Sequence, residues 1–218
     1  MDEFLKSFSD TYEKWRTGGG FSHSSKVIPV HEALSFQQLI LTGEEVLCVL
    51  SGAESFALTD CLCRTHYRNC DNPRDVCFLL DDFSDRVVAR NKARRITLKE
   101  AKEVLKKADE HGLVHLALYM PGQRVYALCS CCACCCHDLR LLLQYHRTDL
   151  VARSGYAAIT DEERCNGCGR CVGRCLFGAR RVNDGLLEFD AAACMGCGLC
   201  VSVCPEKAVG MQKRPGSP

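Results

Sequence analysis

The chain has 218 residues, enough for one domain of medium size and a smaller second one. Its 28 basic and 27 acidic side chains leave a formal net charge of +1, so bulk electrostatics gives no support for a nucleic-acid or membrane partner. No continuous apolar stretch approaches the roughly 18 residues that a membrane-spanning helix needs. The N-terminus lacks a basic region followed by an apolar one, and free cysteines are abundant, so we expect an unprocessed chain in the cytoplasm.

The N-terminal third is predicted to be mainly helical. Residues 2–16 carry apolar side chains at helical spacing and are followed by glycines at 18–20, which predicts an amphipathic helix packed on its own domain. Residues 31–51 also have a mostly helical pattern. A short strand is expected over Ser55–Leu62, leading into the first cysteines, and a helix over Asp81–Asn91.

The clearest helix signal is a capping box formed by Thr97 and Glu100, with Gly112 placed to end the helix. Two strands are expected next, over residues 113–119 and 124–128, joined by a turn at Pro121-Gly122. A helix over 138–147 and a link over 147–155 are expected to follow. We therefore expect an α+β chain, with an N-terminal α/β domain at 1–150 and a smaller domain at 151–218.

Ten cysteines of the N-terminal part fall into two groups. The first group is Cys61, Cys63, Cys70 and Cys77, and the second is Cys129, Cys131, Cys132, Cys134, Cys135 and Cys136. Each group follows a predicted strand. If those two strands are neighbours in one sheet, their C-terminal ends bring both groups to one edge. Six cysteines within eight residues are hard to explain by packing, so we predict a metal site that uses a subset of the ten.

An iron–sulfur cluster is the favoured occupant of this N-terminal site, with zinc and metal-free thiols as the alternatives. Cys48 stands apart on a helix-like apolar stretch and is interpreted as a small buried hydrophobe. Three histidines lie near the cysteines in sequence: His66, His115 and His137. We interpret them as ordinary imidazoles, because cysteines are in excess over the ligands that a cluster needs.

Eight further cysteines repeat the pattern C-x2-C-x2-C-x3-C, the bacterial spacing for [4Fe–4S] clusters. The fourth cysteine of each run ligates the other cluster in two-cluster proteins. Cluster I is thus expected to use Cys165, Cys168, Cys171 and Cys204, and cluster II Cys194, Cys197, Cys200 and Cys175. Zinc is the less favoured occupant of these two runs, because zinc sites usually take two cysteine pairs a dozen or more residues apart. A disulfide framework is also disfavoured, because the 19 cysteines are an odd number and no secretory signal precedes them.

Residues 156–212 resemble the bacterial dicluster ferredoxin domain. Both cysteine runs fit without a gap, and the strand, Asp184-Gly185 turn and strand at 179–189 lie where the family has a hairpin. Pro205 follows the second run as the family expects, but Leu176 follows the first. Many small ferredoxins are acidic, whereas arginines crowd the first repeat here: Arg164, Arg170, Arg174, Arg180 and Arg181.

The N-terminal part also has a resemblance, which spans about residues 30–150. It is carried by Cys-Leu-Cys-Arg at 61–64, Cys-Asp-Asn-Pro at 70–73, Gly-Leu-Val-His at 112–115 and the cysteine cluster. These features are similar to a group of ferredoxin-fused iron–sulfur proteins of anaerobic bacteria and archaea. The resemblance implies an iron–sulfur protein of an anaerobe, but no particular reaction.

The favoured function is electron transfer through two [4Fe–4S] clusters and a further cluster in the N-terminal domain. Arg164, Arg170 and Arg174 would form a docking face for an acidic redox partner or raise the potential of cluster I, with a simple solvated face as the equal alternative. One alternative function is a redox enzyme, or the activating subunit of one, whose N-terminal cluster is catalytic. The other is a thiol or metal-handling protein. No nucleophile–base pair, phosphate loop or flavin fingerprint favours a stand-alone enzyme.

Overall fold

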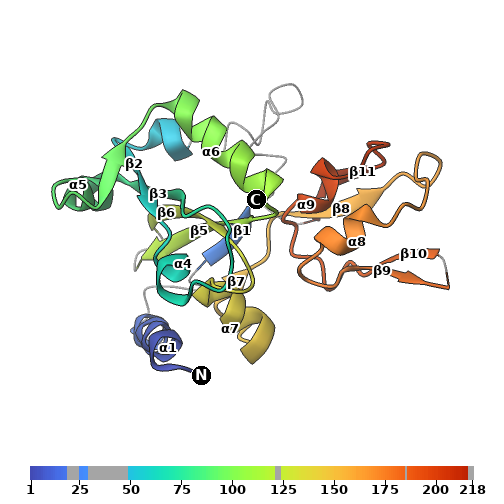
Figure 1. Ribbon diagram of the computed structural model, residues 1–218. Coiled ribbons are helices and arrows are strands. Elements are labelled where there is room, and N and C mark those ends of the chain that lie inside the picture. The colour runs from blue at the N-terminus through green and yellow to red at the C-terminus, as the bar shows by residue number, and fades with distance from the viewer. Residues whose placement is uncertain (19–24, 29–48, 121–123, 185, 216–218) are drawn as a thin grey trace.

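The structure is a computed structural model that describes residues 1–18, 25–28, 49–120, 124–184 and 186–215 (Figure 1). The helix expected over 31–51 lies outside these residues except for its last part, where residues 49–52 are helical. The expected turn at Pro121-Gly122 and the packing of Cys48 also lie outside the described residues.

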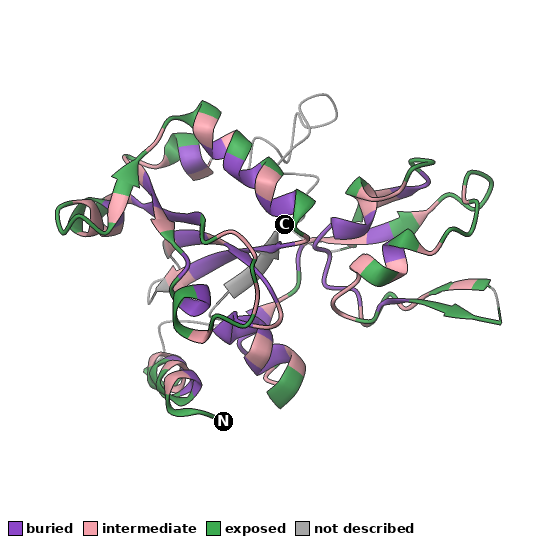
Figure 2. Cartoon of the chain, in the orientation of Figure 1, coloured by how far each residue is buried: buried purple, intermediate pink, exposed green. Residues whose placement is uncertain are grey.

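A mixed sheet of seven strands forms the centre of the N-terminal part. Its strand order is β4-β2-β3-β6-β5-β1-β7, and all neighbours are antiparallel except β1 and β7. The strands are β1 (Ser25–Ile28), β2 (Phe56–Asp60), β3 (Asp75–Leu80), β4 (Ala93–Arg95), β5 (Val114–Met120), β6 (Arg124–Cys131) and β7 (Val151–Ala152). Buried residues concentrate in the inner strands (Figure 2), which therefore form the rigid base of the N-terminal part.

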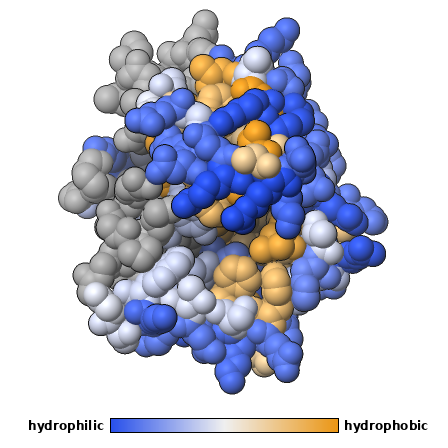
Figure 3. Space-filling view, turned by 90° about the vertical axis from the view of Figure 1, so that its left-hand side faces the viewer, coloured by the Kyte–Doolittle hydropathy of each residue, from blue (hydrophilic) through white to orange (hydrophobic). Residues whose placement is uncertain are grey.

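Helices cover both faces of this sheet (Figure 1). They are α1 (Glu3–Thr17), α4 (Leu62–Tyr67), α5 (Asp81–Val88), α6 (Leu98–Glu110) and α7 (His137–Tyr145). Helices α1 and α7 share one buried core with Leu79 and Ala127, and α6 packs in another core with Phe78 and Leu128. On the face nearest α5, the described apolar residues lie in small groups among hydrophilic ones (Figure 3). None of the described helices is both long enough and apolar enough to cross a membrane.

Among the described residues of the C-terminal part are two short β-pairs and two short helices. Strand β8 (Tyr156–Thr160) pairs antiparallel with β11 (Val209–Lys213), and β9 (Arg180–Asn183) pairs with β10 (Leu186–Phe189). The helices are α8 (Arg170–Arg174) and α9 (Leu199–Ser202). The predicted β9–β10 hairpin is confirmed, and Asp184 has the positive φ of +49° that its turn requires.

The two parts pack directly against each other. The core beneath α1 and α7 also contains residues of the C-terminal part, namely Met195, Cys197 and Leu199. Polar bonds add to this contact: the Ser154 amide donates to the Met195 carbonyl at 3.1 Å, and Ser202 Oγ donates to Asp109 Oδ1 at 2.9 Å. The predicted link at 147–155 is therefore part of a packed junction.

The expected α+β fold class is confirmed, and the capping box of α6 forms as predicted. Asp2 accepts a hydrogen bond from the Leu5 amide at 2.8 Å and begins α1. Thr97 and Glu100 form the reciprocal capping box of α6, and Gly112 follows the helix with φ +69°.

Strand β3 is not predicted by the sequence pattern. Five of its six residues are buried, so it shows no alternation of apolar and polar side chains. It lies between β2 and β6, so the expectation that the strands before the two cysteine groups are neighbours is wrong. Because β3 is antiparallel to both, β2 and β6 run in the same direction and their C-terminal ends still share one edge.

Candidate metal centres

The sheet register brings the N-terminal cysteines together. Cys77 on β3 lies directly opposite Cys129 on β6, and the side chains of such a pair point to the same face of the sheet. Cys131, two residues along β6, points to that face as well. Cys61 and Cys63 follow the end of β2, and Cys136 is the N-cap residue of α7. Three separate chain segments therefore place thiols at one edge of the sheet.

Six of these thiols form a closed ring, which we call the six-thiol ring. Cys61 interacts through its side chain with Cys63 and Cys77, and Cys129 interacts with Cys77 and Cys131. Cys136 closes the ring through its interactions with Cys131 and Cys63. Five of the six side chains are buried and Cys129 is half-buried. Each member of the ring thus has two thiol neighbours.

Contacts between neighbouring thiols of the ring, which share protons, shift their pKa values in opposite directions. The pKa is lowered for three thiols, namely Cys61, Cys129 and Cys136. It is raised for the three thiols between them, namely Cys63, Cys77 and Cys131. Metal ions that displace the shared protons would bind the same sulfur atoms as thiolates.

The other four cysteines form a second group, which we call the thiol tetrad. Its members are Cys70, Cys132, Cys134 and Cys135, and their sulfur atoms all lie within 4.8 Å of one another. Cys70 Sγ is 3.8 Å from Cys132 Sγ and 3.9 Å from Cys135 Sγ. Asn72 Nδ2 donates to Cys70 Sγ at 3.4 Å, so a neutral donor supports this thiol.

Arg64 lies between the ring and the tetrad. Its side chain is 2 % exposed, and its Nη1 donates to Cys132 Sγ of the tetrad at 3.5 Å. The nearby charges of Cys61 and Cys77, which belong to the ring, raise the pKa of Arg64 against the opposing effect of burial. Nη2 donates to the Ser130 carbonyl at 2.8 Å, which fixes the guanidinium group on β6. One buried cation therefore neutralises charge in both groups.

The three histidines differ in their contacts. His137 Nδ1 lies 3.0 Å from Cys63 Sγ, and its Nε2 lies 2.7 Å from the Tyr12 hydroxyl. No sequence pattern singles out this histidine, because its contact with the ring depends on how α1 and α7 pack. His66 stacks on Phe4 at 3.9 Å, and the buried His115 bonds to Ser130. Burial lowers the pKa of His115 to about 4, so this imidazole is neutral at physiological pH.

The C-terminal cysteines lie in two loops with the same backbone geometry. Gly167 and Gly169 in the first loop have φ values of +71° and +69°, and Gly196 and Gly198 in the second have +75° and +77°. Each loop then enters a short helix that carries the third cysteine of its run, Cys171 in α8 or Cys200 in α9. The sequence repeat is therefore also a structural repeat.

Two cavities lie beside these loops, and each is lined by four of the eight cysteines. One is lined by Cys165, Cys168, Cys171 and Cys204. The other is lined by Cys175, Cys194, Cys197 and Cys200. In both cases the last cysteine of one run joins the first three of the other run. Four thiols around an apolar hollow are a donor set that suits a cubane cluster.

Comparison with protein families agrees with this geometry. Residues 157–205 match the family described as a 4Fe-4S dicluster domain. The C-terminal part is a ferredoxin-like dicluster domain. A search of curated proteins finds no match for the chain.

Arg180 lines the cavity of the second loop, contacts Cys171 of the other predicted ligand set and is 2 % exposed. Burial raises the pKa values of Cys171 and Cys200, which line different cavities. The Arg180 guanidinium partly offsets this, because its positive charge lowers both pKa values. Its Nη1 donates to Thr160 Oγ1 at 2.9 Å, whereas Nε and Nη2 are buried without a partner of normal hydrogen-bond geometry. A buried cation therefore faces both predicted ligand sets.

The three arginines expected to form a docking face differ in their exposure and in their contacts. Arg174 is half-buried, and its Nη2 donates to the Asp109 and Glu110 carbonyls at 2.7 and 3.2 Å, at the C-terminal end of α6. It holds the dicluster domain to the N-terminal part. Arg164 and Arg170 are exposed.

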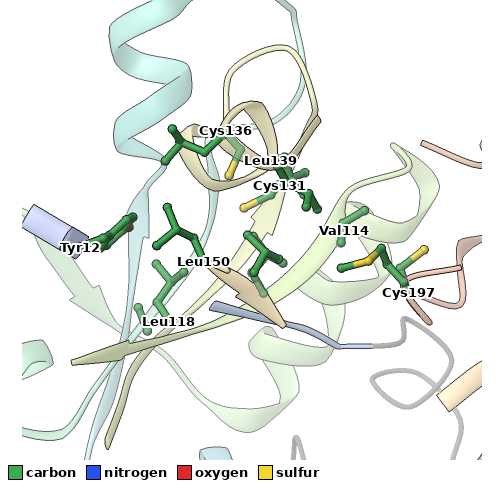
Figure 4. Packing of buried hydrophobic residues seen from close by; sticks show 14 of the residues in the cluster. Tyr12, Val114, Leu118, Cys131, Cys136, Leu139, Leu150 and Cys197 are labelled. Carbon is green, nitrogen blue, oxygen red and sulfur yellow. The ribbon is translucent and has the colours of Figure 1, made fainter. Parts of the chain in front are cut away.

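The cavity of the second loop adjoins the N-terminal core. Cys197 lies in the same buried cluster as Cys131 and Cys136 of the six-thiol ring (Figure 4). Val114 and Leu139 belong to this cluster too, and Val114 is the register partner of Cys131. Closely packed apolar residues thus connect a predicted cluster ligand to the ring.

Proposed function

We propose that the protein carries electrons between two [4Fe–4S] clusters of the dicluster domain and a metal centre of the N-terminal cysteines. Such clusters, when bound by thiolates, accept and release single electrons. The observation that carries the proposal is the shared buried core, which contains Cys197 of the dicluster domain together with Cys131 and Cys136 of the six-thiol ring. An electron carrier needs its centres shielded from water, and this core is buried and mainly apolar.

The ligand sets follow the two cavities. Cluster I takes Cys165, Cys168, Cys171 and Cys204, and cluster II takes Cys175, Cys194, Cys197 and Cys200. The crossed pairing is supported by the cysteines that line each hollow. In this proposal the N-terminal domain at 1–150 holds the further centre, and the dicluster domain at 151–218 exchanges electrons with a partner protein.

The exposed arginines and the abundance of free thiols support two further parts of the proposal. Arg164 and Arg170 lie at the surface of the first repeat and would attract an acidic redox partner. Eighteen described cysteines are free of disulfide bonds, which suits a reducing cytoplasm and an anaerobic cell.

Anaerobic iron and acid-labile sulfide analysis, combined with electron paramagnetic resonance of the reduced protein, tests the function. We expect two interacting reduced [4Fe–4S] signals. Their absence from protein reconstituted with iron and sulfide would contradict electron transfer by this domain.

Paired variants test the crossed ligand sets. Cys204→Ser should alter the same signal as Cys165→Ser, and Cys175→Ser the same signal as Cys194→Ser. The opposite pairing, in which Cys204→Ser behaves like Cys194→Ser, would show that each run holds its own cluster.

A further inference from the structure

The ten N-terminal cysteines divide by their contacts into the six-thiol ring and the thiol tetrad. Cys70 Sγ lies 3.8 and 3.9 Å from two other sulfur atoms of the tetrad, whereas the side chain of Cys61 contacts Cys63 and Cys77 of the ring. Cys131 and Cys132 are adjacent in sequence, yet the first belongs to the ring and the second to the tetrad. This separation arises because successive side chains at the end of β6 point in different directions.

The spacing of the tetrad matches a single metal ion. A tetrahedral ion with metal–sulfur bonds of about 2.3 Å holds its sulfurs about 3.8 Å apart. The two distances from Cys70 Sγ, 3.8 and 3.9 Å, agree with this value. The four thiolates of a cubane each bind a different iron and are therefore farther apart. A tetrahedral set of four thiolates is typical of zinc or of one iron.

The ring differs from the tetrad in the number and burial of its thiols. Four thiolates satisfy one ion or one cubane, and the ring has six, of which five are buried. Arg64 is a buried cation shared by both groups. If all six ring thiols bind as thiolates, one divalent ion and Arg64 supply three positive charges against six negative ones, and uncompensated buried charge is costly. A polynuclear centre supplies the further positive charge.

We propose that the ten cysteines form two metal sites, a mononuclear four-thiolate site in the tetrad and a polynuclear iron–sulfur centre bound by the six-thiol ring. The iron–sulfur nature of the ring centre rests on the proposed electron-transfer function. The division into one ion and one polynuclear centre rests on the sulfur positions of the tetrad and on the number of thiols in the ring. The ring is the site that shares a core with Cys197, so it is the electron-accepting partner of the dicluster domain.

Two double variants of the full chain, purified without oxygen, separate the sites and act as controls for each other. Cys70→Ser/Cys134→Ser changes two half-buried members of the tetrad, and Cys129→Ser/Cys136→Ser changes two alternate members of the ring. Metals are measured by mass spectrometry and sulfide by acid release. Far-ultraviolet circular dichroism and the dicluster signals check that each variant is folded.

The tetrad variant should lose one zinc or iron atom per chain and no sulfide. The ring variant should lose several iron atoms together with sulfide and keep the roughly eight irons of the two cubanes. Loss of sulfide from the tetrad variant, or unchanged iron in a folded ring variant, would overturn the division. A ring that holds copper or zinc without sulfide would overturn its iron–sulfur nature. If the dicluster signals are missing while the ring iron is present, the proposed function fails but the two-site division stands.

Discussion

Arg180 is the residue whose position most directly affects the dicluster domain. Burying a cation is costly unless negative charge lies nearby. Arg180 has one hydrogen bond, to Thr160, and its guanidinium lies 5.0 Å from the centre of the Phe189 ring. Cys171 and Cys200 lie beside the guanidinium group. As ligands of anionic clusters, they would supply the negative charge that offsets the buried positive charge of Arg180. Arg180 is therefore suited to stabilise extra electrons in both clusters.

Replacement of Arg180 by leucine should lower the reduction potentials of both clusters, because the reduced state of each loses a nearby cation. For a one-electron couple, about 59 mV corresponds to a tenfold change in the equilibrium constant. We expect a decrease on the order of 50–100 mV, measured by redox titration followed by electron paramagnetic resonance. The matched control is Arg181→Leu, because Arg181 is the next residue on β9 and is exposed. Equal shifts in the two variants would show that surface charge sets the potentials.

The sequence alone does not distinguish Arg180 from its neighbours. Five arginines crowd the first repeat, and the docking interpretation concerns Arg164, Arg170 and Arg174 instead. Alternation along a strand predicts that Arg180 and Arg181 point to opposite faces, but not which face is buried. That choice depends on the packing of the β9–β10 hairpin against the two cysteine loops, which brings together residues distant in sequence.

At the scale of loops, the second cysteine loop is held by the segment that joins the two parts of the chain. A side chain at Gly196 would collide with the Tyr156 carbonyl oxygen and would lie 2.8 Å from Ser154 Cβ. Gly167 occupies the equivalent place in the first loop with nearly the same φ, yet a Cβ added there would have nothing within 4 Å of it. The two glycines therefore have the same backbone strain but different surroundings.

Gly196→Ala should destabilise the protein more than Gly167→Ala. Alanine at a positive φ costs about 1 kcal/mol at either position, and the collision with a backbone atom should raise the cost at Gly196 to about 3 kcal/mol. Thermal unfolding of the cluster-loaded protein, followed by circular dichroism, measures the difference. Similar melting temperatures for the two variants would mean that the joining segment moves aside freely.

At the scale of helices, the C-terminal end of α6 accepts hydrogen bonds from Arg174. The last carbonyls of a helix carry partial negative charge and lack partners within the helix, so a cation there is stabilising. Arg174→Ala should lower the melting temperature by about 2–6 °C, since each degree corresponds to a small fraction of a kcal/mol in a chain of this size. Arg164→Ala is the control, because Arg164 bonds to the Glu206 carbonyl within the dicluster domain. A larger effect of the control would argue against Arg174 as a contact between the parts.

Helices are easier to predict than the sheet. The capping box at Thr97 is a local signal, and α6 begins where that signal indicates. Strand β3 is buried on both faces and has no such signal, and it carries Cys77, which joins the two cysteine segments into the ring. The convergence of the two cysteine groups can be expected from the sequence. Their division into a ring and a tetrad cannot, because it depends on the directions of individual sulfur atoms.

At the scale of the whole molecule, the dicluster domain and the N-terminal sheet depend on each other. The dicluster domain is small, and a short chain segment buries too little apolar surface to be stable without its clusters. Met195, Cys197 and Leu199 complete the core beneath α1 and α7. Loss of cluster II should therefore disturb residues far from its ligands, because the same side chains serve both the cluster site and the N-terminal core.

Removal of the clusters with an iron chelator under oxidising conditions should increase hydrogen exchange first in the second cysteine loop and then in β5 and α7. The physical reason is that Cys197 belongs to the same buried core as Val114 of β5 and Leu139 of α7, so release of the loop opens that core. Strand β4 lies at the opposite edge of the sheet and should retain its exchange rate, which makes it the internal control. Exchange measured by mass spectrometry on the intact chain follows all of these segments together. Unchanged protection of β5 and α7 after cluster loss would mean that the two parts fold independently, and the packed route for electrons between Cys197 and Cys131 would then lack its structural basis.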